Sequence, residues 1–406
     1  MINNKRMQRT ALLILLFLMM QLTGCKSPRT APSADGTIAQ VSAELDSLFS
    51  SLFKADEPGA AVVVVRGDSI VYDKGFGLAR LDSVTPITDR TMFNICSVSK
   101  QFSAMALFVL AEEGKLSLDD TVSKYFPEFK ADFFQRITLR HLLSHTSGIP
   151  DARPRTAEEW KRYTVATKTQ FKSVDDFKRF CEEDESCRYL ESLDSLAFEP
   201  GTQYEYQNPT FQLMLMIVEK VTGEKFDDWM RTRIFLPAGM TDATYFEPDK
   251  FIPRMAHAYT PAEGGNPYNY FRSADGKWEE CDYGEANFFG TKADGGLYTT
   301  PLEFVKWDKA LYSDLLISEA MRREAHSGKI ATDIPDTDYG YGWFIEHRPD
   351  RPQKIYHTGD NGGFLIFEGR FPDKDLFYLI FANRPDWDRE GTVEEVDKVF
   401  ERNGWI

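Results

Sequence analysis

Residues 91–114 read TMFNICSVSKQFSAMALFVLAEEG. The segment places a hydroxyl and an amine, on Ser97 and Lys100, at the start of a long apolar stretch. The apolar residues recur with helical spacing, and Gly114 is typical of the position just after a helix. The sequence therefore predicts a helix over 97–113 that opens at Ser97. Residues three apart lie on one helical face, so the hydroxyl and the amine can meet.

The start of a helix suits a nucleophilic serine. It carries positive potential and free backbone N–H groups where an oxyanion forms. A buried lysine beside Ser97 either loses its proton more easily or holds the proton network of the serine in place. The Ser-x-x-Lys pattern is weak by itself, because Ser51-Leu52-Phe53-Lys54 matches it too. We interpret that second copy as the solvated face of an amphipathic helix predicted over 38–54.

A second motif, Tyr206-Gln207-Asn208, is the only Tyr-x-Asn sequence among the 17 tyrosines. A tyrosine held near cations can take a proton from a serine, so Tyr206 is a candidate partner of Ser97. The amide of Asn208 is suited to orient a substrate carbonyl or nitrogen. By itself the motif favours an ordinary loop tyrosine packed on the helix that follows.

A third motif, His357-Thr358-Gly359, lies at the end of a predicted strand. A strand edge with a small glycine lets a substrate backbone lie alongside it. The backbone N–H of the next residue, Asp360, can then join that of Ser97 as an oxyanion hole. By itself this motif is an ordinary strand-end turn, so its meaning depends on the other two.

Taken in this order, the three motifs resemble the serine β-lactamase and penicillin-binding protein superfamily, in the branch of class C β-lactamases, D-alanyl-D-alanine carboxypeptidases and esterases. Residues 91–95, 141–148 and 295–300 are similar to further segments of this branch, so the resemblance covers nearly the whole chain after its first 24 residues. It implies no cofactor. The catalytic residues would be Ser97, Lys100 and Tyr206, and the substrate-binding residues Asn208, His357, Thr358, Gly359 and Asp360.

Strand patterns occur at both ends of the chain, and residues 138–286 between them read as mostly helix and loop. This predicts an α+β fold, in which an antiparallel sheet built from both chain ends is flanked by helices and carries an inserted, mainly helical subdomain. The resemblance implies the same β-lactamase/transpeptidase-like architecture over 38–406, with a sheet part at about 38–92 and 296–406 and a helical part at about 93–295. The predicted strands are 60–65, 70–76, 342–347, 354–357, 363–371 and 376–382, and further helices are predicted at 211–221, 226–235 and 392–402.

The composition is that of an ordinary globular protein. The chain has 406 residues, is 42% hydrophobic, and has 48 Lys and Arg against 63 Asp and Glu, which gives a formal net charge of −15. An acidic chain repels phosphate backbones, so we expect no nucleic-acid partner. We expect a small-molecule or peptide-like substrate instead; the oligomeric state is left open.

The first 24 residues have the pattern of an export signal. Three positive charges precede an apolar run over 11–20 that is too short to span a bilayer. Leu22-Thr23-Gly24-Cys25 resembles the lipobox of bacterial lipoproteins, which implies lipidation of Cys25 and cleavage just before it. We expect residues 25–37 to form a tether, and the protein to face the periplasm or the cell exterior from a membrane anchor. The alternative is a plain signal peptide with an incidental cysteine.

Cysteine and histidine positions suggest one disulfide and no metal site. Cys181 and Cys187 are close in sequence and are the pair that we expect to bond in an exported protein. His141 and His145 have a spacing that zinc ligands use, but no glutamate lies between them and no third ligand is evident. We expect His257, His326 and His347 at the surface or in loops.

The resemblance implies a hydrolase that acts through a Ser97 acyl-enzyme on an ester, amide or lactam carbonyl. His357 stands where β-lactamases usually carry lysine, and a histidine is mostly neutral near pH 7. Asp360 adds a negative charge beside it, so we expect weak selection for anionic β-lactams, with esterase and D,D-peptidase activities open. The alternatives are an acyltransferase that passes the acyl group to an alcohol or amine, and a non-catalytic cell-wall-binding lipoprotein.

Overall fold

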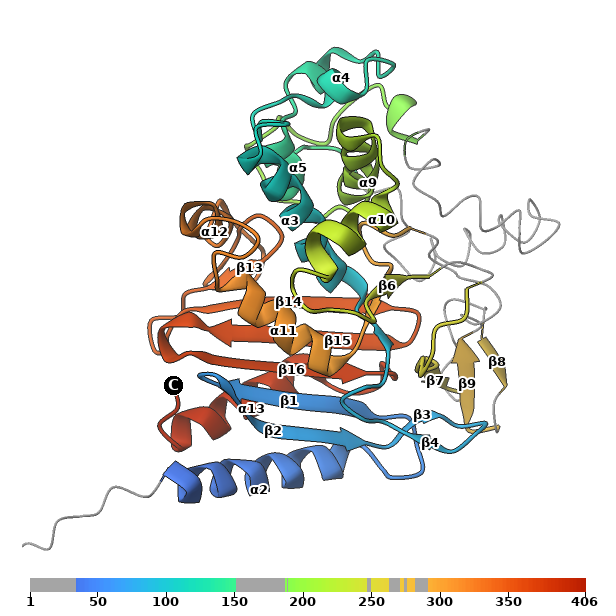
Figure 1. Ribbon diagram of the computed structural model, residues 1–406, viewed down its shortest axis with the longest axis vertical. Coiled ribbons are helices and arrows are strands. Elements are labelled where there is room, and N and C mark those ends of the chain that lie inside the picture. Colours follow the sequence, from blue (N-terminus) through green and yellow to red (C-terminus); the bar gives the residue numbers. More distant parts are fainter. Residues whose placement is uncertain are drawn as a thin grey trace, which may run out of the picture.

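An eight-stranded antiparallel sheet forms the base of the molecule, and a group of helices stands on it (Figure 1). The computed structural model describes residues 34–150, 187, 189–246, 250–262, 271–273, 276–281 and 291–406. The strand order is β11-β12-β13-β14-β15-β16-β1-β2, so the first strand of the chain, β1, pairs with the last, β16, and β2 lies outside β1. This confirms the predicted α+β fold with a sheet built from both chain ends.

The strands of the large sheet and the helices have the following bounds. The strands are β1 (Ala60–Arg66), β2 (Ser69–Phe76), β11 (Ile330–Ala331), β12 (Thr337–Tyr339), β13 (Phe344–Glu346), β14 (Lys354–Asn361), β15 (Phe364–Phe371) and β16 (Leu376–Ala382). The α-helices are α2 (Ala34–Leu52), α3 (Ser99–Glu112), α4 (Val122–Tyr125), α5 (Leu139–Leu143), α9 (Pro209–Thr222), α10 (Phe226–Met230), α11 (Pro301–Leu311), α12 (Glu319–Ala325) and α13 (Arg389–Arg402).

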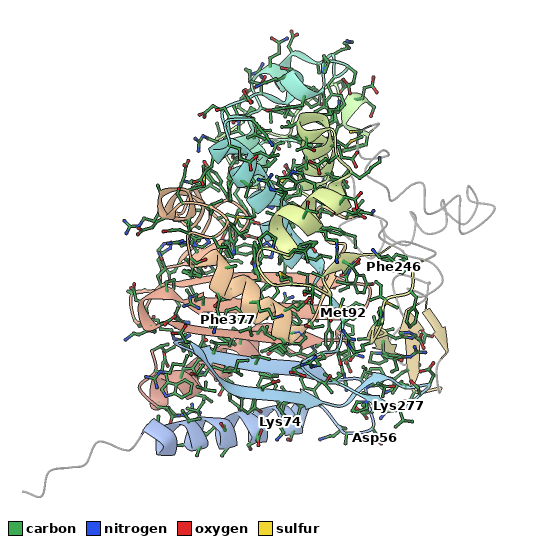
Figure 2. The ribbon with its side chains drawn as sticks, in the orientation of Figure 1. Asp56, Lys74, Met92, Phe246, Lys277 and Phe377 are labelled. Atoms are coloured by element: carbon green, nitrogen blue, oxygen red, sulfur yellow. The ribbon has the colours of Figure 1, made fainter. Side chains whose placement is uncertain are left out.

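The central strands are apolar on both faces because helices cover both. In β1, Val62 and Val64 pack in the cluster formed with α2 and α13. The alternate residue Val63 packs in the larger cluster, which contains α3 and α11. Phe377 of β16 lies beneath α11, where its ring stacks on that of Phe304 with 6.1 Å between the centroids (Figure 2). This alternation fixes which face of the sheet meets the helical part.

The middle of the chain is less purely helical than predicted. It contains β6 (Thr244–Tyr245), which joins β5 (Phe93–Asn94) and β10 (Leu297–Thr299), and a separate sheet of β7 (Tyr259–Pro261), β8 (Phe271–Ser273) and β9 (Trp278–Cys281). Strands of two to four residues are too short for an alternating pattern to show in the sequence. Lys277, beside Asp56 in Figure 2, ties this small sheet to the large one through an ion pair with Glu57.

Several predicted features fall outside the described residues. These are the leader, the lipidation site at Cys25, most of the tether and Cys181 of the expected disulfide. α2 begins at Ala34, inside the segment predicted as tether. In the part of the chain that the structure describes, no helix is long and apolar enough to cross a membrane.

Candidate active site

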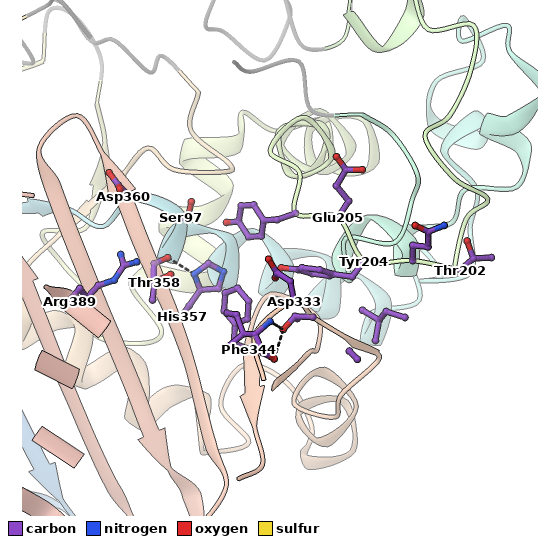
Figure 3. A pocket seen from close by; sticks show the side chains of 16 residues that line it. Ser97, Thr202, Tyr204, Glu205, Asp333, Phe344, His357, Thr358, Asp360 and Arg389 are labelled. Carbon is purple, nitrogen blue, oxygen red and sulfur yellow. Dashed lines mark hydrogen bonds between the residues drawn. The ribbon is translucent and has the colours of Figure 1, made fainter. Parts of the chain in front are cut away.

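Ser97 opens onto a cavity of about 860 Å³ between the helical part and the sheet (Figure 3). In that view Ser97, Thr358 and Asp360 lie on the sheet side and Tyr204 on the helical side. The walls come from six separate parts of the chain, which the fold alone brings together. The lining residues are Ser97, 202–206, 330–334, Phe344, His357, Thr358, Asp360 and Arg389.

The turn that carries Ser97 differs from the prediction. The α-helix does not open at Ser97; a 3₁₀ turn, Cys96–Val98, precedes α3. Cys96 is held at φ +53°, a backbone region that costs energy for a residue with a side chain. Its N–H donates to the Asn94 side-chain oxygen at 2.9 Å, which fixes the turn. Ser97 is thus presented on a strained, well-anchored corner.

Strand β14 passes directly against this corner. A Cβ on Gly359 would lie 2.6 Å from the carbonyl oxygen of Ile95 and 2.7 Å from the Cβ of Cys96, so only glycine allows the approach. β14 also runs on to Asn361, because β15 pairs with it over its length. We had predicted the His-Thr-Gly motif at the end of a strand, and this was wrong. The motif lies inside the strand.

Lys100 is completely buried and directed at Ser97. Its Nζ donates to Ser97 Oγ at 3.1 Å, to Asn208 Oδ1 at 2.6 Å and to the Asp294 carbonyl at 2.7 Å. Three acceptors are what a buried ammonium group requires. The predicted contact between hydroxyl and amine is therefore present, and the charged lysine is held in it.

Tyr206 lies in the loop before α9 and lines the same cavity as Ser97. The Lys100 Nζ is 5.0 Å from the centroid of its ring. The hydroxyl and the amine come from one segment and the phenol from a second, more than 100 residues away, and the amine lies close to both. Their catalytic roles stay predictions.

Asn208 is placed differently from its predicted role in substrate binding. It is buried, and its amide oxygen accepts the hydrogen bond from Lys100. It is not among the residues that line the cavity, whereas Thr358 and Asp360 are. The geometry supports a role for Asn208 in holding Lys100, and its contact with substrate stays a prediction.

His357 lines the cavity as a neutral ring. Its Nδ1 donates to the Thr358 carbonyl at 2.6 Å, and its Nε2 accepts from the hydroxyl of Tyr339 at 3.0 Å. Burial, followed by the charge of Lys100, lowers the pKa of His357 to about 3. His357 therefore supplies no positive charge at neutral pH.

The edge of β14 beside the cavity is available for a substrate backbone. β13 pairs with β14 only from Lys354 to Tyr356. Beyond Tyr356, no described strand pairs with the side of β14 that faces β13. Thr358 and Asp360 lie in this unpaired part. That a substrate backbone lies along this edge, and that Ser97 and Asp360 form an oxyanion hole, stay predictions.

Among the described residues an arginine, Arg389, also lines the cavity, and it was not predicted from the sequence. Arg389 is the first residue of α13, and its Nη1 donates to the Gly359 carbonyl at 3.2 Å. Its Nη2 donates to Glu390 at 2.6 Å, which offsets the charge. No short motif marks Arg389, because only the packing of α13 on the sheet brings it to the site.

Comparison with known proteins identifies the family. Residues 38–398 match the family model described as Beta-lactamase. The chain belongs to this family. It is 29% identical over 338 residues to Penicillin-binding protein 4* of Bacillus subtilis (strain 168), which covers 82% of this chain and 70% of that protein. It is also 29% identical over 346 residues to Protein flp of Staphylococcus aureus (strain COL), of whose length the match spans 62%.

Solved structures share the fold. The octameric penicillin-binding protein homologue from Pyrococcus abyssi superposes with a TM-score of 0.72 at 22% identity, over 90% of this chain and 77% of that one. D-amino acid amidase from Ochrobactrum anthropi SV3 gives 0.67 at 24% identity, over 90% and 97%. EstCE1, described as a hydrolase with promiscuous acyltransferase activity, gives 0.69 at 18%, over 89% and 98%. The chain thus has the fold of these structures, and the family to which it belongs is one of serine hydrolases.

The described residues offer no metal site. Within the part of the chain described by the structure, no three His, Cys, Asp or Glu side chains lie together as metal ligands would. His141 instead accepts a hydrogen bond from the Thr138 backbone N–H at the start of α5.

A buried carboxyl group on β15 makes stability depend on pH. Glu368 pairs in register with His357 and accepts a hydrogen bond from Gln101. Burial raises the pKa of Glu368 from its usual 4.5 to about 8. The folded state thus keeps a proton that the unfolded chain releases, so stability falls as the pH rises between these two values.

We expect Glu368→Gln to remove this dependence. Between pH 5 and pH 9 the wild type should lose about 3 kcal/mol more unfolding free energy than the variant. Urea unfolding at the two pH values measures the difference. Glu395→Gln, at an exposed position of α13, is the control. Equal pH profiles of wild type and Glu368→Gln would contradict the assignment.

Proposed function

We propose that this protein is a hydrolase that forms an acyl-enzyme at Ser97 on the carbonyl of an ester, an amide or a lactam. The observation that carries the proposal is the 3.1 Å hydrogen bond from Lys100 Nζ to Ser97 Oγ at the wall of an open cavity. A fixed ammonium beside the hydroxyl, with a phenol in the same cavity, is an arrangement that activates serine. It argues against a non-catalytic binding protein, which needs none of these contacts.

The reaction follows from these positions. Ser97 Oγ attacks the carbonyl carbon while its proton passes to the phenolate oxygen of Tyr206, an anion that the positive charge of Lys100 stabilises. The backbone N–H groups of Ser97 and Asp360 hold the oxyanion. The C–X bond then breaks, the leaving group takes the proton, and an ester to Ser97 remains. Water adds to this ester with Tyr206 as base and restores the serine.

The charges around the cavity bear on the substrate class. His357 is neutral, and the guanidinium of Arg389 is paired with Glu390. Three acidic residues, Glu205, Asp333 and Asp360, also line the cavity. This wall is poorly suited to attract a carboxylate, so we propose esters and amides without a carboxylate, including D-amino-acid amides, as substrates in preference to anionic β-lactams.

A second cavity of about 700 Å³ adjoins the first and shares Phe344, Thr358 and Arg389 with it. It lies over the sheet face that α13 covers and contains Tyr356 and Val393. The two cavities together exceed what a short acyl group fills. This supports a peptide-like substrate that extends beyond the scissile bond.

The proposal is tested by comparing three substrate types on the purified protein. We expect kcat/KM for p-nitrophenyl esters or D-amino-acid amides to exceed that for nitrocefin by at least about 100-fold, since a misplaced charge costs several kcal/mol (about 1.4 kcal/mol per tenfold). Efficient turnover of nitrocefin would overturn the substrate preference. Absence of turnover of all three, with no labelling by a fluorophosphonate probe, would overturn the hydrolase itself.

Acyl transfer is the second candidate. The fold is shared with EstCE1, a hydrolase with promiscuous acyltransferase activity. An acyl-enzyme at an open cavity can meet an alcohol or amine as well as water. The same assay with a competing amine or alcohol, followed by product analysis, separates the two, because transfer yields a new ester or amide and hydrolysis yields the free acid.

We further propose that the hydrolase is held at a membrane surface by lipid on Cys25, outside the cytoplasm. The support is the sequence Leu22-Thr23-Gly24-Cys25 after a short apolar run. A lipid anchor at this position would leave the catalytic body free to reach substrates near the membrane.

A further inference from the structure

His145 is buried in an unfavourable backbone conformation next to the catalytic tyrosine. It has no solvent exposure, and its φ is +55°, a region that residues with side chains rarely adopt. It follows α5 in the segment 144–148. Such a conformation persists only where many surrounding contacts hold the backbone in it. Strained residues of this kind cluster at functional sites.

His145 accepts hydrogen bonds from both sequence neighbours of Tyr206. Its carbonyl oxygen accepts from the Glu205 N–H at 3.0 Å. Its Nδ1 accepts from the Gln207 N–H at 3.1 Å. Ser147, two residues further, adds a hydrogen bond from its Oγ to the Gln207 side-chain oxygen at 2.8 Å. The backbone that carries the phenol is thus tied down on either side by one short segment.

The ring of His145 also supports the phenol ring from behind. The ring centroids of His145 and Tyr206 are 4.2 Å apart. Phe211 and Tyr339 close around the histidine with centroid distances of 5.0 and 4.8 Å. A ring so confined cannot move away from Tyr206 without displacing these neighbours.

The protonation of His145 is fixed by the same contacts. Because Nδ1 accepts a hydrogen bond, the proton of the neutral ring is on Nε2. In the described part of the structure, this Nε2 has no hydrogen-bond partner, and a buried donor without a partner costs about 1–3 kcal/mol. Burial, then the charge of Lys100, holds the pKa of His145 well below its usual value, so Nδ1 stays an acceptor.

We propose that His145 is a positioning residue for Tyr206: it fixes the tyrosine through the N–H groups on either side and through ring contact, and thereby sets the phenol for proton transfer from Ser97. The inference rests on the proposed acyl-enzyme function and goes beyond it. His145 touches no substrate, so it acts only through Tyr206. Its loss should therefore lower kcat and leave KM nearly unchanged.

Two substitutions separate the acceptor from the ring. His145→Asn keeps an acceptor close to the Nδ1 position and tolerates a positive φ. His145→Leu keeps the bulk and loses the acceptor. We expect His145→Leu to lower kcat about 100-fold or more with KM within about threefold, and His145→Asn to remain within about tenfold of the wild type. His145→Gln, which has no acceptor near Nδ1, replaces His145→Leu if that variant does not fold.

A double-mutant cycle with Tyr206→Phe decides the mechanism. If His145 acts through the phenol, His145→Leu should cost less than about threefold once the phenol is gone. A full, additive loss in that background would overturn the proposal. So would equal activity of the leucine and asparagine variants in the presence of Tyr206.

His326 supplies the matched control. We expected it at the surface or in a loop; it lies in the turn after α12 and is buried, with its ring against Trp343 and with Nε2 lacking a hydrogen-bond partner among the described residues. His326→Leu should change stability and not kcat; a comparable loss of kcat would show that any buried histidine has this effect. A wild type that does not label with a fluorophosphonate probe refutes the acyl-enzyme itself, whereas a labelled wild type with an unaffected His145→Leu variant refutes only the positioning role.

Discussion

Replacement of Ser97 by alanine is expected to lower kcat/KM by about 10⁴-fold or more and to abolish labelling by a fluorophosphonate or penicillin probe. Alanine removes the Oγ that would carry the acyl group, and no covalent intermediate can form. The fold should survive, because Lys100 keeps its hydrogen bonds to Asn208 and to the Asp294 carbonyl. Intact-protein mass spectrometry after probe treatment measures the result directly.

The chain contains its own control for this experiment. Ser51 and Lys54 repeat the Ser-x-x-Lys spacing at the end of α2, yet the Lys54 amine donates to the Ser51 carbonyl and not to its hydroxyl. Both residues are exposed. Ser51→Ala should therefore label and turn over like the wild type. Undiminished labelling of Ser97→Ala would show that another residue is the nucleophile.

Replacement of Lys100 by methionine should have the second-largest effect, a loss of about 10³-fold or more in the acylation rate. Methionine matches the length of the side chain and lacks the charge and the three donors. The buried oxygens of Asn208 and Asp294 then lose a hydrogen bond, so we also expect about 2–4 kcal/mol lower stability. Stopped-flow acylation, corrected for the folded fraction from thermal unfolding, separates the two effects.

Lys54→Met is the control for this substitution. It removes an exposed amine at the same spacing and should alter neither rate nor stability by more than about 0.5 kcal/mol. If Lys100→Met retains an acylation rate within about tenfold of the wild type, the ammonium is not part of the proton exchange, and Tyr206 alone must activate Ser97.

The parts of the site that the sequence revealed are the local ones. Ser97 and Lys100 are three residues apart, so their contact follows from helical geometry even though the turn is 3₁₀ at its start. The strands β1 and β16 were evident from continuous apolar runs, because both of their faces are covered. The prediction that Tyr206 lies near Ser97 and Lys100 rested on a resemblance in the order of the motifs and not on their spacing.

The remaining features depend on tertiary contacts that leave no local pattern. Arg389 reaches the cavity only because α13 packs on the sheet, and Asn208 meets Lys100 only because α9 packs on α3. β14 is longer than predicted because β15 continues to pair with it as far as Asn361. The residues of β14 itself do not indicate this extension. The role of His145 could be inferred only from the structure, which shows its hydrogen bonds to both neighbours of Tyr206.

The joining of both chain ends in one sheet has a consequence for how the molecule acquires its shape. Ala60 of β1 pairs with Ala382 of β16, and the Gly59 N–H is bonded to Asn383 Oδ1 across 324 residues. Closing so long a loop is slow, so the hairpin of β1 and β2 must wait, with the other edge of β1 unpaired, until the last part of the polypeptide emerges. Premature termination anywhere before β16 would leave the edge of β1 open to other chains and prone to aggregate.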